Sequence, residues 1–178
     1  LPTVRSRIQR LSFGQLTASE VVEIVGGADL DPSVVQVAAT AADGSAGRAL
    51  ALVSGELVAA RDAAVGVLHN VSMARDARGL MDAAKEFVGK SRAGSPARQD
   101  LTRRLSALTS LLRDVELVAA GSTKGLANTD VVDGLKTLSR TYGGVRGVKA
   151  FASVGTALDA VERNLSPKVI ADWLVCQL

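Results

Sequence analysis

TAADGSAGRALAL, residues 40–52, contains the end of one helix, a break and the start of the next. An apolar run closes at Ala42, and Asp43 and Gly44 interrupt it. A glycine just past a helix end adopts the left-handed conformation without steric cost, and a serine that follows can accept from free N–H groups of the next helix. We therefore predict a turn at Gly44 and a new helix that Ser45 caps.

Two further helix starts precede this junction. Thr17 and Glu20 have the T-x-x-E spacing of a capping box, which opens an amphipathic run. Asp31 followed by Pro32 has the order of an N-cap and a proline at the first helical position. Together with the helix after residue 45, these signals predict a small three-helix domain over residues 15–56.

The region 57–178 continues the helical pattern. Apolar residues recur there at the spacing of one helix face, most clearly from Leu101 to Val118. Serine-proline pairs at residues 95–96 and 166–167 each combine a cap with a first-turn proline. We expect five or six helices in this second domain, and the predicted fold class is all-α.

Residues 1–14 are the most strand-like part of the chain. Leu11 and Phe13 alternate with Arg10 and Ser12, which is the two-residue period of a half-buried strand. An isolated strand needs a sheet to join, and the rest of the chain predicts none. We therefore expect residues 1–14 to be the remnant of another domain, and the chain, which lacks an initiator Met, to be part of a longer protein.

Composition limits the classes of function. The 178 residues are 47% hydrophobic and 22% charged, as in a globular protein, and the formal net charge is only +3. The basic residues are dispersed along the chain, which argues against a dedicated nucleic-acid surface. No apolar run is long enough to span a bilayer, and the single cysteine, Cys176, excludes an internal disulfide. We expect a cytoplasmic protein with no membrane contact.

The junction GSAGRAL, residues 44–50, resembles the GS-x-GRAL segment in the lid of AAA+ clamp-loader subunits of bacterial DNA polymerase III, in the version that delta-prime subunits carry. In the ATP-hydrolysing subunits the run is GS-x-RDAL, and its arginine senses the bound nucleotide. Gly47 occupies that arginine column here, and Arg48 takes the Asp column. The resemblance therefore implies a subunit that does not need to hydrolyse ATP. Taken alone, the segment also suits a tight helix connection with no special role.

A second resemblance lies in residues 3–9, TVRSRIQ, which are similar to the T-x-x-SRC-Q motif of clamp-loader subunits. It implies that Arg7 reaches into the ATP site of a neighbouring subunit as an arginine finger, a role worth about 10³–10⁵ in rate where measured. Ile8 departs from the cysteine of the motif, at a position that bears no charge. Without the resemblance, Arg5, Arg7 and Arg10 form a solvated basic edge.

The third resemblance is at the C-terminus. NLSP, residues 164–167, followed by Trp173, Leu174 and Leu178, is similar to the N-x-NP…LL ending of the family, whose terminal helices form the collar of a five-subunit ring. It implies an interface role for Trp173, Leu174 and Leu178. From its size alone, Trp173 suits either the interior or an interface, and we favour the interior.

The segments LLRD, residues 111–114, and NTD, residues 128–130, fit the same family, so the resemblance extends over the whole chain. It implies a lid at 15–56 and a collar at 57–178. The implied partners are the other clamp-loader subunits (gamma/tau and delta), with the sliding clamp and primed DNA reached through the complex. The alternatives are a gamma/tau-type motor subunit of the same complex and a free-standing helical adaptor.

Other chemistries find no support in the sequence. His69 is the only histidine, so no zinc-ligand spacing is present. The triplet at residues 89–91, GKS, lacks the glycine that a phosphate loop has five residues earlier. We therefore expect no cofactor and no catalysis from these residues alone, the ATPase activity belonging to the parent complex.

Overall fold

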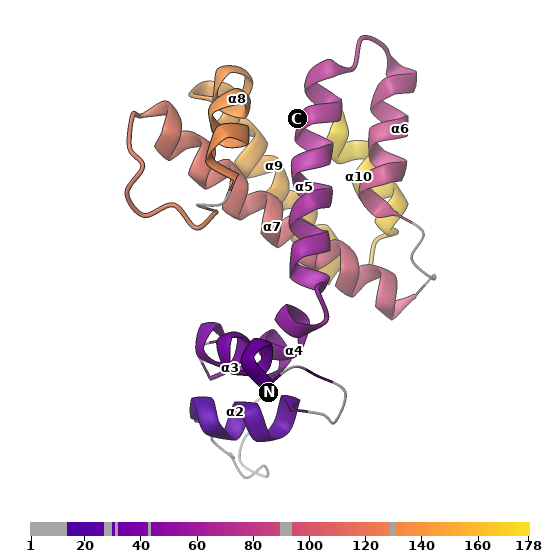
Figure 1. The fold of residues 1–178 in the computed structure, drawn as a ribbon. Coiled ribbons are helices and arrows are strands. Elements are labelled where there is room, and N and C mark those ends of the chain that lie inside the picture. The colour runs from indigo at the N-terminus through magenta and orange to yellow at the C-terminus, as the bar shows by residue number, and fades with distance from the viewer. Residues whose placement is uncertain (1–13, 27–29, 31, 43, 90–93, 129–130) are drawn as a thin grey trace, which may run out of the picture. The chain divides into compact units, whose positions relative to one another are not determined.

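The computed structural model describes residues 14–26, 30, 32–42, 44–89, 94–128 and 131–178. The chain divides into two compact units, unit 1 (Leu1–Glu56) and unit 2 (Leu57–Leu178). Every regular element in the described residues is an α-helix, so the all-α prediction is confirmed for them (Figure 1). The strand predicted within residues 1–14 lies outside the described residues, except for Gly14, which belongs to no helix or strand. The identification of the units as lid and collar stays a prediction.

Unit 1 contains α2 (Ala18–Val25), α3 (Pro32–Ala41) and α4 (Ala46–Val53). The predicted capping box at the start of α2 is confirmed. The Glu20 amide donates to Thr17 Oγ1 at 3.3 Å, and the Thr17 amide donates to Glu20 Oε2 at 2.8 Å. The second bond lowers the pKa of the Glu20 carboxyl, because it favours the charged form.

The core of unit 1 is small and aliphatic. Its buried members are Val21, Val25, Val35, Ala39, Ala42 and Ala49. Because valine and alanine bury little apolar area each, the caps and turns of this unit carry a larger share of its stability than they do in a leucine-rich core.

Unit 2 contains α5 (Glu56–Met73), α6 (Ala77–Val88), α7 (Ser95–Ala119), α8 (Val132–Tyr142), α9 (Val145–Glu162) and α10 (Pro167–Val175). The predicted start of α7 needs one correction. Ser95 is the first helical residue and does not cap the helix, because Gly94, with φ of 100°, occupies the N-cap position. Ser166 does occupy the N-cap of α10, but its side chain accepts no hydrogen bond there.

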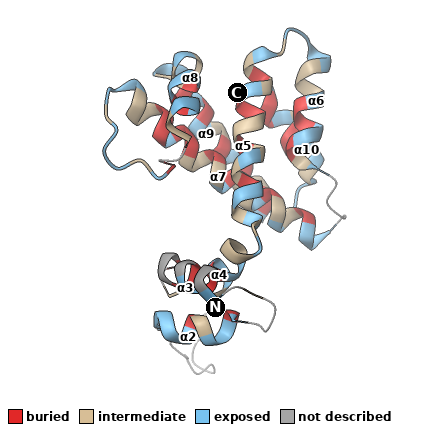
Figure 2. Cartoon of the chain, viewed as in Figure 1, coloured by how far each residue is buried: buried red, intermediate tan, exposed pale blue. Residues whose placement is uncertain are grey.

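The centre of unit 2 is α7. It packs against α8 and α9, while α10 packs against α6 and α9. Five leucines of α7 are at most 2% exposed, and Figure 2 shows the buried residues on the sides where these helices meet. Full burial of one such side chain stabilises by about 1.5–3 kcal/mol. The leucines are Leu101, Leu105, Leu108, Leu111 and Leu112.

One hydrogen bond ties α8 to α5 across this core. The hydroxyl of Tyr142, which is fully buried, donates to the carbonyl oxygen of Leu68 at 3.0 Å. Burial raises the pKa of Tyr142 above its usual value, although the Arg146 guanidinium, 4.8 Å from the ring centre, acts in the opposite direction.

Candidate functional site

The junction between α3 and α4 has the predicted geometry. Gly44 has φ of 76°, and a Cβ at this position would lie 2.8 Å from the carbonyl oxygen of Leu16. The Leu16 amide donates to the Gly44 carbonyl oxygen at 3.2 Å, so the chain before α2 is held against this turn. Ser45 Oγ accepts from the Arg48 amide at 3.3 Å and caps α4.

The residues that the family resemblance links to nucleotide are placed as follows. Arg7 lies outside the described residues, so its role in a neighbouring ATP site stays a prediction. Gly47 is exposed inside α4, and a Cβ added there would have no other atom within 4 Å. Arg48 follows it on the same exposed part of the helix.

The structure places the three predicted C-terminal interface residues differently. Leu174 is fully buried and Leu178 is 7% exposed, and both belong to the core of unit 2. Their side chains therefore pack inside the unit and are not available to a partner in this conformation. Trp173 is 39% exposed, so our preference for an interior position was wrong. The reason is that α10 is apolar on opposite sides and buries Ile170 instead.

Exposed large apolar side chains are concentrated in α9 and α10, and we call them together the exposed apolar surface of these helices. Six of the ten large apolar side chains exposed among the described residues lie within these two helices and the turn between them. Large apolar side chains that stay exposed are candidate contacts for a binding partner. The six are Val145, Val148, Phe151, Leu165, Val169 and Trp173.

On α10 this surface forms what we call the α10 ridge, composed of Lys168, Val169, Asp172 and Trp173. Val169 and Trp173 are one helical turn apart and are 58% and 39% exposed. Lys168 and Asp172 form a parallel charged row directly beside them. Neither forms an ion pair within the described residues.

On α9 the exposed apolar residues border a groove of about 470 Å³, which we call the α7–α9 groove. Val148 and Phe151 of α9 form one wall, and Leu117 of α7 lies on the other. Two charged residues of α7, Arg113 and Glu116, also line it. The groove therefore combines an apolar interior with one cation and one anion that lie about one helical turn apart.

Glu116 is held in an unusual place for a carboxylate. Its Oε1 atom is buried and has no hydrogen-bond partner in the described structure. It lies against Gly147 in the first turn of α9, where a Cβ would collide with Glu116 Oε1 and with the carbonyl oxygen of Tyr142. Free N–H groups at a helix N-terminus favour a nearby negative charge, which accounts for this position.

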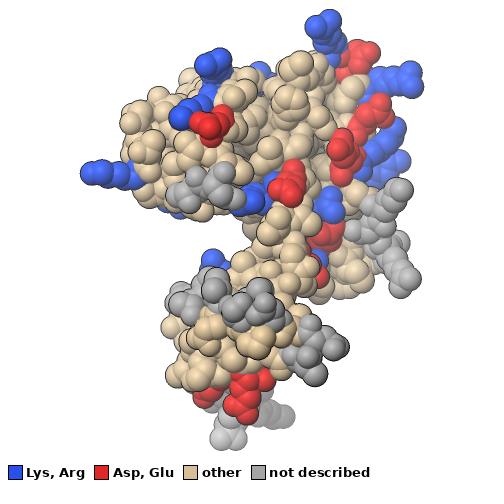
Figure 3. Space-filling model, in the orientation of Figure 1, with Lys and Arg blue, Asp and Glu red and all other residues tan. Residues whose placement is uncertain are grey.

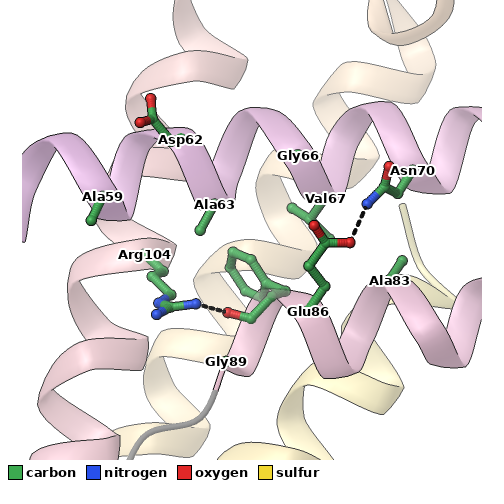
Figure 4. Close-up of a pocket in the computed structure, with 11 residues that line it drawn as sticks. Ala59, Asp62, Ala63, Gly66, Val67, Asn70, Ala83, Glu86, Gly89 and Arg104 are labelled. Carbon is green, nitrogen blue, oxygen red and sulfur yellow. Dashed lines mark hydrogen bonds between the residues drawn. The ribbon is translucent and has the colours of Figure 1, made fainter.

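A second cavity, of about 400 Å³, lies between α5 and α6 (Figure 4). Small side chains line the α5 side, at Ala59, Ala63 and Gly66. Figure 4 shows Arg104 of α7 at one end and the pair formed by Asn70 and Glu86 at the other, where Asn70 Nδ2 donates to Glu86 Oε2 at 2.8 Å.

Arg104 links α6 and α7 beside this cavity. Its Nη1 donates to the carbonyl oxygen of Phe87 at 2.5 Å, and its Nη2 lies 2.9 Å from Asp100 Oδ2. The guanidinium thus meets the C-terminal carbonyls of α6, where positive charge is stabilising. The main charged group of this cavity is therefore used to hold α6 and α7 together.

Asp114 of the LLRD segment contacts Asn128, the first residue of the NTD segment, whose other two residues lie outside the described ones. Asp114 is fully buried, and its Oδ2 accepts from the Ala127 amide at 2.9 Å, from the Asn128 amide at 2.8 Å and from Asn128 Nδ2 at 2.8 Å. Donors in this number satisfy the buried carboxylate oxygens, which would otherwise carry a large desolvation cost. The contact, which we call the Asp114 clamp, fastens the loop after α7 onto that helix.

Charged side chains of both signs lie over α6 on the face drawn in Figure 3. On the face drawn in Figure 3, cations and anions alternate over α6, where Lys85 pairs with Asp82 at 2.8 Å. This pair lowers the pKa of Asp82. The pattern differs from the continuous basic stripe of a nucleic-acid-binding face.

Two other kinds of site are absent from the described part of the chain. No three or more His, Cys, Asp or Glu side chains there are close enough to hold a metal ion. None of the helices there has the length and apolar character required to cross a membrane.

Sequence reasoning missed Val148, Phe151 and Glu116. The signal for Val148 and Phe151 was the distribution of apolar residues around α9. Ala150, Val154 and Ala157 form the buried face of this helix, and further apolar residues lie outside that face. Glu116 had no such signal, because its position depends on how α9 crosses α7.

Comparison with known proteins gives no relative from which to assign a function. No family model matches the chain, and neither a curated protein nor a solved structure resembles it significantly.

Proposed function

We propose that the chain is the lid and collar portion of a bacterial DNA polymerase III clamp-loader subunit of the delta-prime type, acting in the cytoplasm. In this proposal unit 2 joins neighbouring gamma/tau and delta subunits into the ring that opens the sliding clamp and closes it on primed DNA. Three sequence resemblances in the family order support it, at residues 3–9, 44–50 and 164–178.

The observation that carries the proposal is the exposed apolar surface of α9 and α10. A helical unit that keeps Val148, Phe151 and Trp173 in solvent gains stability when a second protein covers them. Tryptophan, which Trp173 contributes to this surface, is among the residue types most enriched among strong contributors to binding.

The division of labour between the units follows from their chemistry. Gly47 in the lid segment offers no side chain to a phosphate, so the subunit would bind its neighbours without hydrolysing ATP itself. Arg7 would complete the ATP site of the next subunit, since a guanidinium stabilises charge on the transferring phosphoryl group.

Reconstitution of the full-length subunit with gamma/tau and delta subunits from the same organism tests both parts. Replacing Trp173 by Asp should release the subunit from the complex in gel filtration, whereas Arg7→Ala should leave assembly intact and slow clamp-loader ATP hydrolysis. The control is Asp133→Ala on an exposed part of α8. Full assembly of the Trp173→Asp variant would remove the interface role, and unchanged turnover of Arg7→Ala would remove the finger role.

A further inference from the structure

Unit 2 carries two different interaction features that match each other. One is the α10 ridge, with an apolar row and a charged row side by side. The other is the α7–α9 groove, with an apolar interior and a charged pair on α7. We propose that the α10 ridge of one copy of this chain binds in the α7–α9 groove of a second copy. The proposal goes beyond the proposed function, which concerns different subunits.

The apolar parts are complementary in shape and chemistry. Trp173 and Val169 project one turn apart from α10, and the groove of about 470 Å³ is larger than an indole ring. Val148 and Phe151, which are 63% and 46% exposed, would lose their contact with water against these side chains.

The charged parts have matching spacings and opposite signs. Lys168 and Asp172 are about 6 Å apart along α10, and Glu116 and Arg113 are about 4.5 Å apart along α7. With Trp173 in the groove, Lys168 faces Glu116 of the second copy and Asp172 faces Arg113. None of these four side chains forms an ion pair within the described residues. Arg113 Nη2 donates to the carbonyl oxygen of Gly125 at 2.9 Å, and the other N–H groups of its guanidinium remain for Asp172 of the second copy.

Glu116 determines in which direction α10 of one copy runs along α7 of the other. Its buried Oε1 atom has no hydrogen-bond donor within the described residues, and an incoming ammonium group beside the carboxylate compensates for part of that cost. If α10 bound in the reverse direction, Asp172 would face Glu116, and like charges across an interface disfavour that arrangement.

The ridge and the groove are different patches of the chain, so the contact is head-to-tail. Such an interface extends to chains or closes into rings, in contrast to a two-fold dimer. A ridge of two helical turns buries less than the roughly 1,200–2,000 Å² of a stable complex, so the association is weak. It should be measurable only at high protein concentration.

The test is sedimentation equilibrium of the 178-residue chain from about 10 µM to about 1 mM, the range in which weak interfaces associate. We expect the average mass to rise with concentration. Trp173→Asp blocks the ridge and Phe151→Asp blocks the groove, so each variant alone should stay monomeric. Mixed, the two variants should form a pair of one-to-one composition and stop there. Circular dichroism confirms that each variant is folded.

Charge reversal provides a second measurement that leaves the apolar contact intact. Glu116→Lys alone should weaken association at least about tenfold, as truncation of a paired buried charge does, and adding Lys168→Glu in the same chain should restore it. A wild-type chain that stays monomeric at the highest concentration, a mixture that does not pair, or a double reversal without rescue would each overturn the proposal. These results leave assembly with gamma/tau and delta subunits untouched, so the two proposals fail separately.

Discussion

Replacement of Asp114 tests whether the Asp114 clamp stabilises unit 2. In Asp114→Ala, the Asn128 amide and Asn128 Nδ2 both lose an acceptor 2.8 Å away, in a residue that is only 9% exposed. The Ala127 amide can form a hydrogen bond with water instead, because Ala127 is exposed. Hydrogen bonds to a charged group contribute about 1.5–3 kcal/mol each, so we expect unit 2 to lose about 3–5 kcal/mol, a large part of a typical total of about 5–15 kcal/mol.

Asp114→Asn shows how much of the stabilisation comes from the negative charge, because it removes the charge and keeps a hydrogen-bond acceptor. One amide oxygen can still occupy the position of Oδ2 and accept all three bonds, while the 3.2 Å contact from the Ala127 amide to Oδ1 is lost. We expect a smaller loss of about 1–2 kcal/mol. The matched control is Asp133→Ala, which removes an exposed carboxylate paired with Lys136 at 2.9 Å and should change stability by less than about 0.5 kcal/mol.

The assay is urea unfolding of the 178-residue chain followed by circular dichroism, with amide hydrogen exchange at Ala127 and Asn128 as a local readout. The clamp predicts fast exchange of both amides in Asp114→Ala and a lower unfolding midpoint for unit 2. An Asp114→Ala protein within about 1 kcal/mol of the wild type would show that water replaces the carboxylate freely, and would refute the reasoning.

Three further predictions concern single contacts. Gly44→Ala should destabilise unit 1 by about 1–2 kcal/mol in thermal unfolding, because φ at this position is positive and the new Cβ would contact backbone atoms. The control, Gly47→Ala inside α4, should stabilise the unit by up to about 1 kcal/mol. Equal effects of the two substitutions would contradict the geometry of the turn. Tyr142→Phe should cost about 0.5–1.5 kcal/mol through the lost bond to Leu68. Because burial raises the pKa of Tyr142, the stability that its neutral hydroxyl contributes is present below the pKa of the unfolded chain and is lost as the pH rises through the pKa of the folded chain. The loss of stability at alkaline pH should therefore be smaller in Tyr142→Phe. Ultraviolet absorbance follows the ionisation of this single tyrosine, and a titration at the ordinary tyrosine pKa would contradict the expectation. Thr17→Ala should lower the stability of unit 1 by about 1 kcal/mol, and an unchanged midpoint in thermal unfolding would show that the capping box contributes nothing.

Local signals in the sequence predicted the features that depend on a few neighbouring residues. The capping box of Thr17 and Glu20 and the turn at Gly44 need only residues three or four positions apart, so the sequence contains their cause. The cap at Ser95 failed for a related reason. Either Gly94 or Ser95 could have been the N-cap of α7. Gly94 occupies the N-cap because this position has a positive φ, which glycine adopts without strain.

Features that depend on the crossing of helices were not predictable in the same way. The apolar residues of α10 lie on opposite sides, and only the positions of α6 and α9 decide that Leu174 is buried while Trp173 is exposed. The Asp114 clamp joins residues 13 and 14 positions apart through a loop whose path no local rule specifies. The family resemblance named both of its segments but gave no reason for them to meet.

The bond from Tyr142 to Leu68 has a consequence for how unit 2 is made. Its donor follows its acceptor by 74 residues. At a synthesis rate of about 5–20 residues per second, α5 therefore leaves the ribosome about 4–15 s before the residue that completes its packing. During that interval the apolar face of α5 has only part of its cover, so the side chains of Val67 and Leu68, which are buried in the finished unit, stay accessible to water.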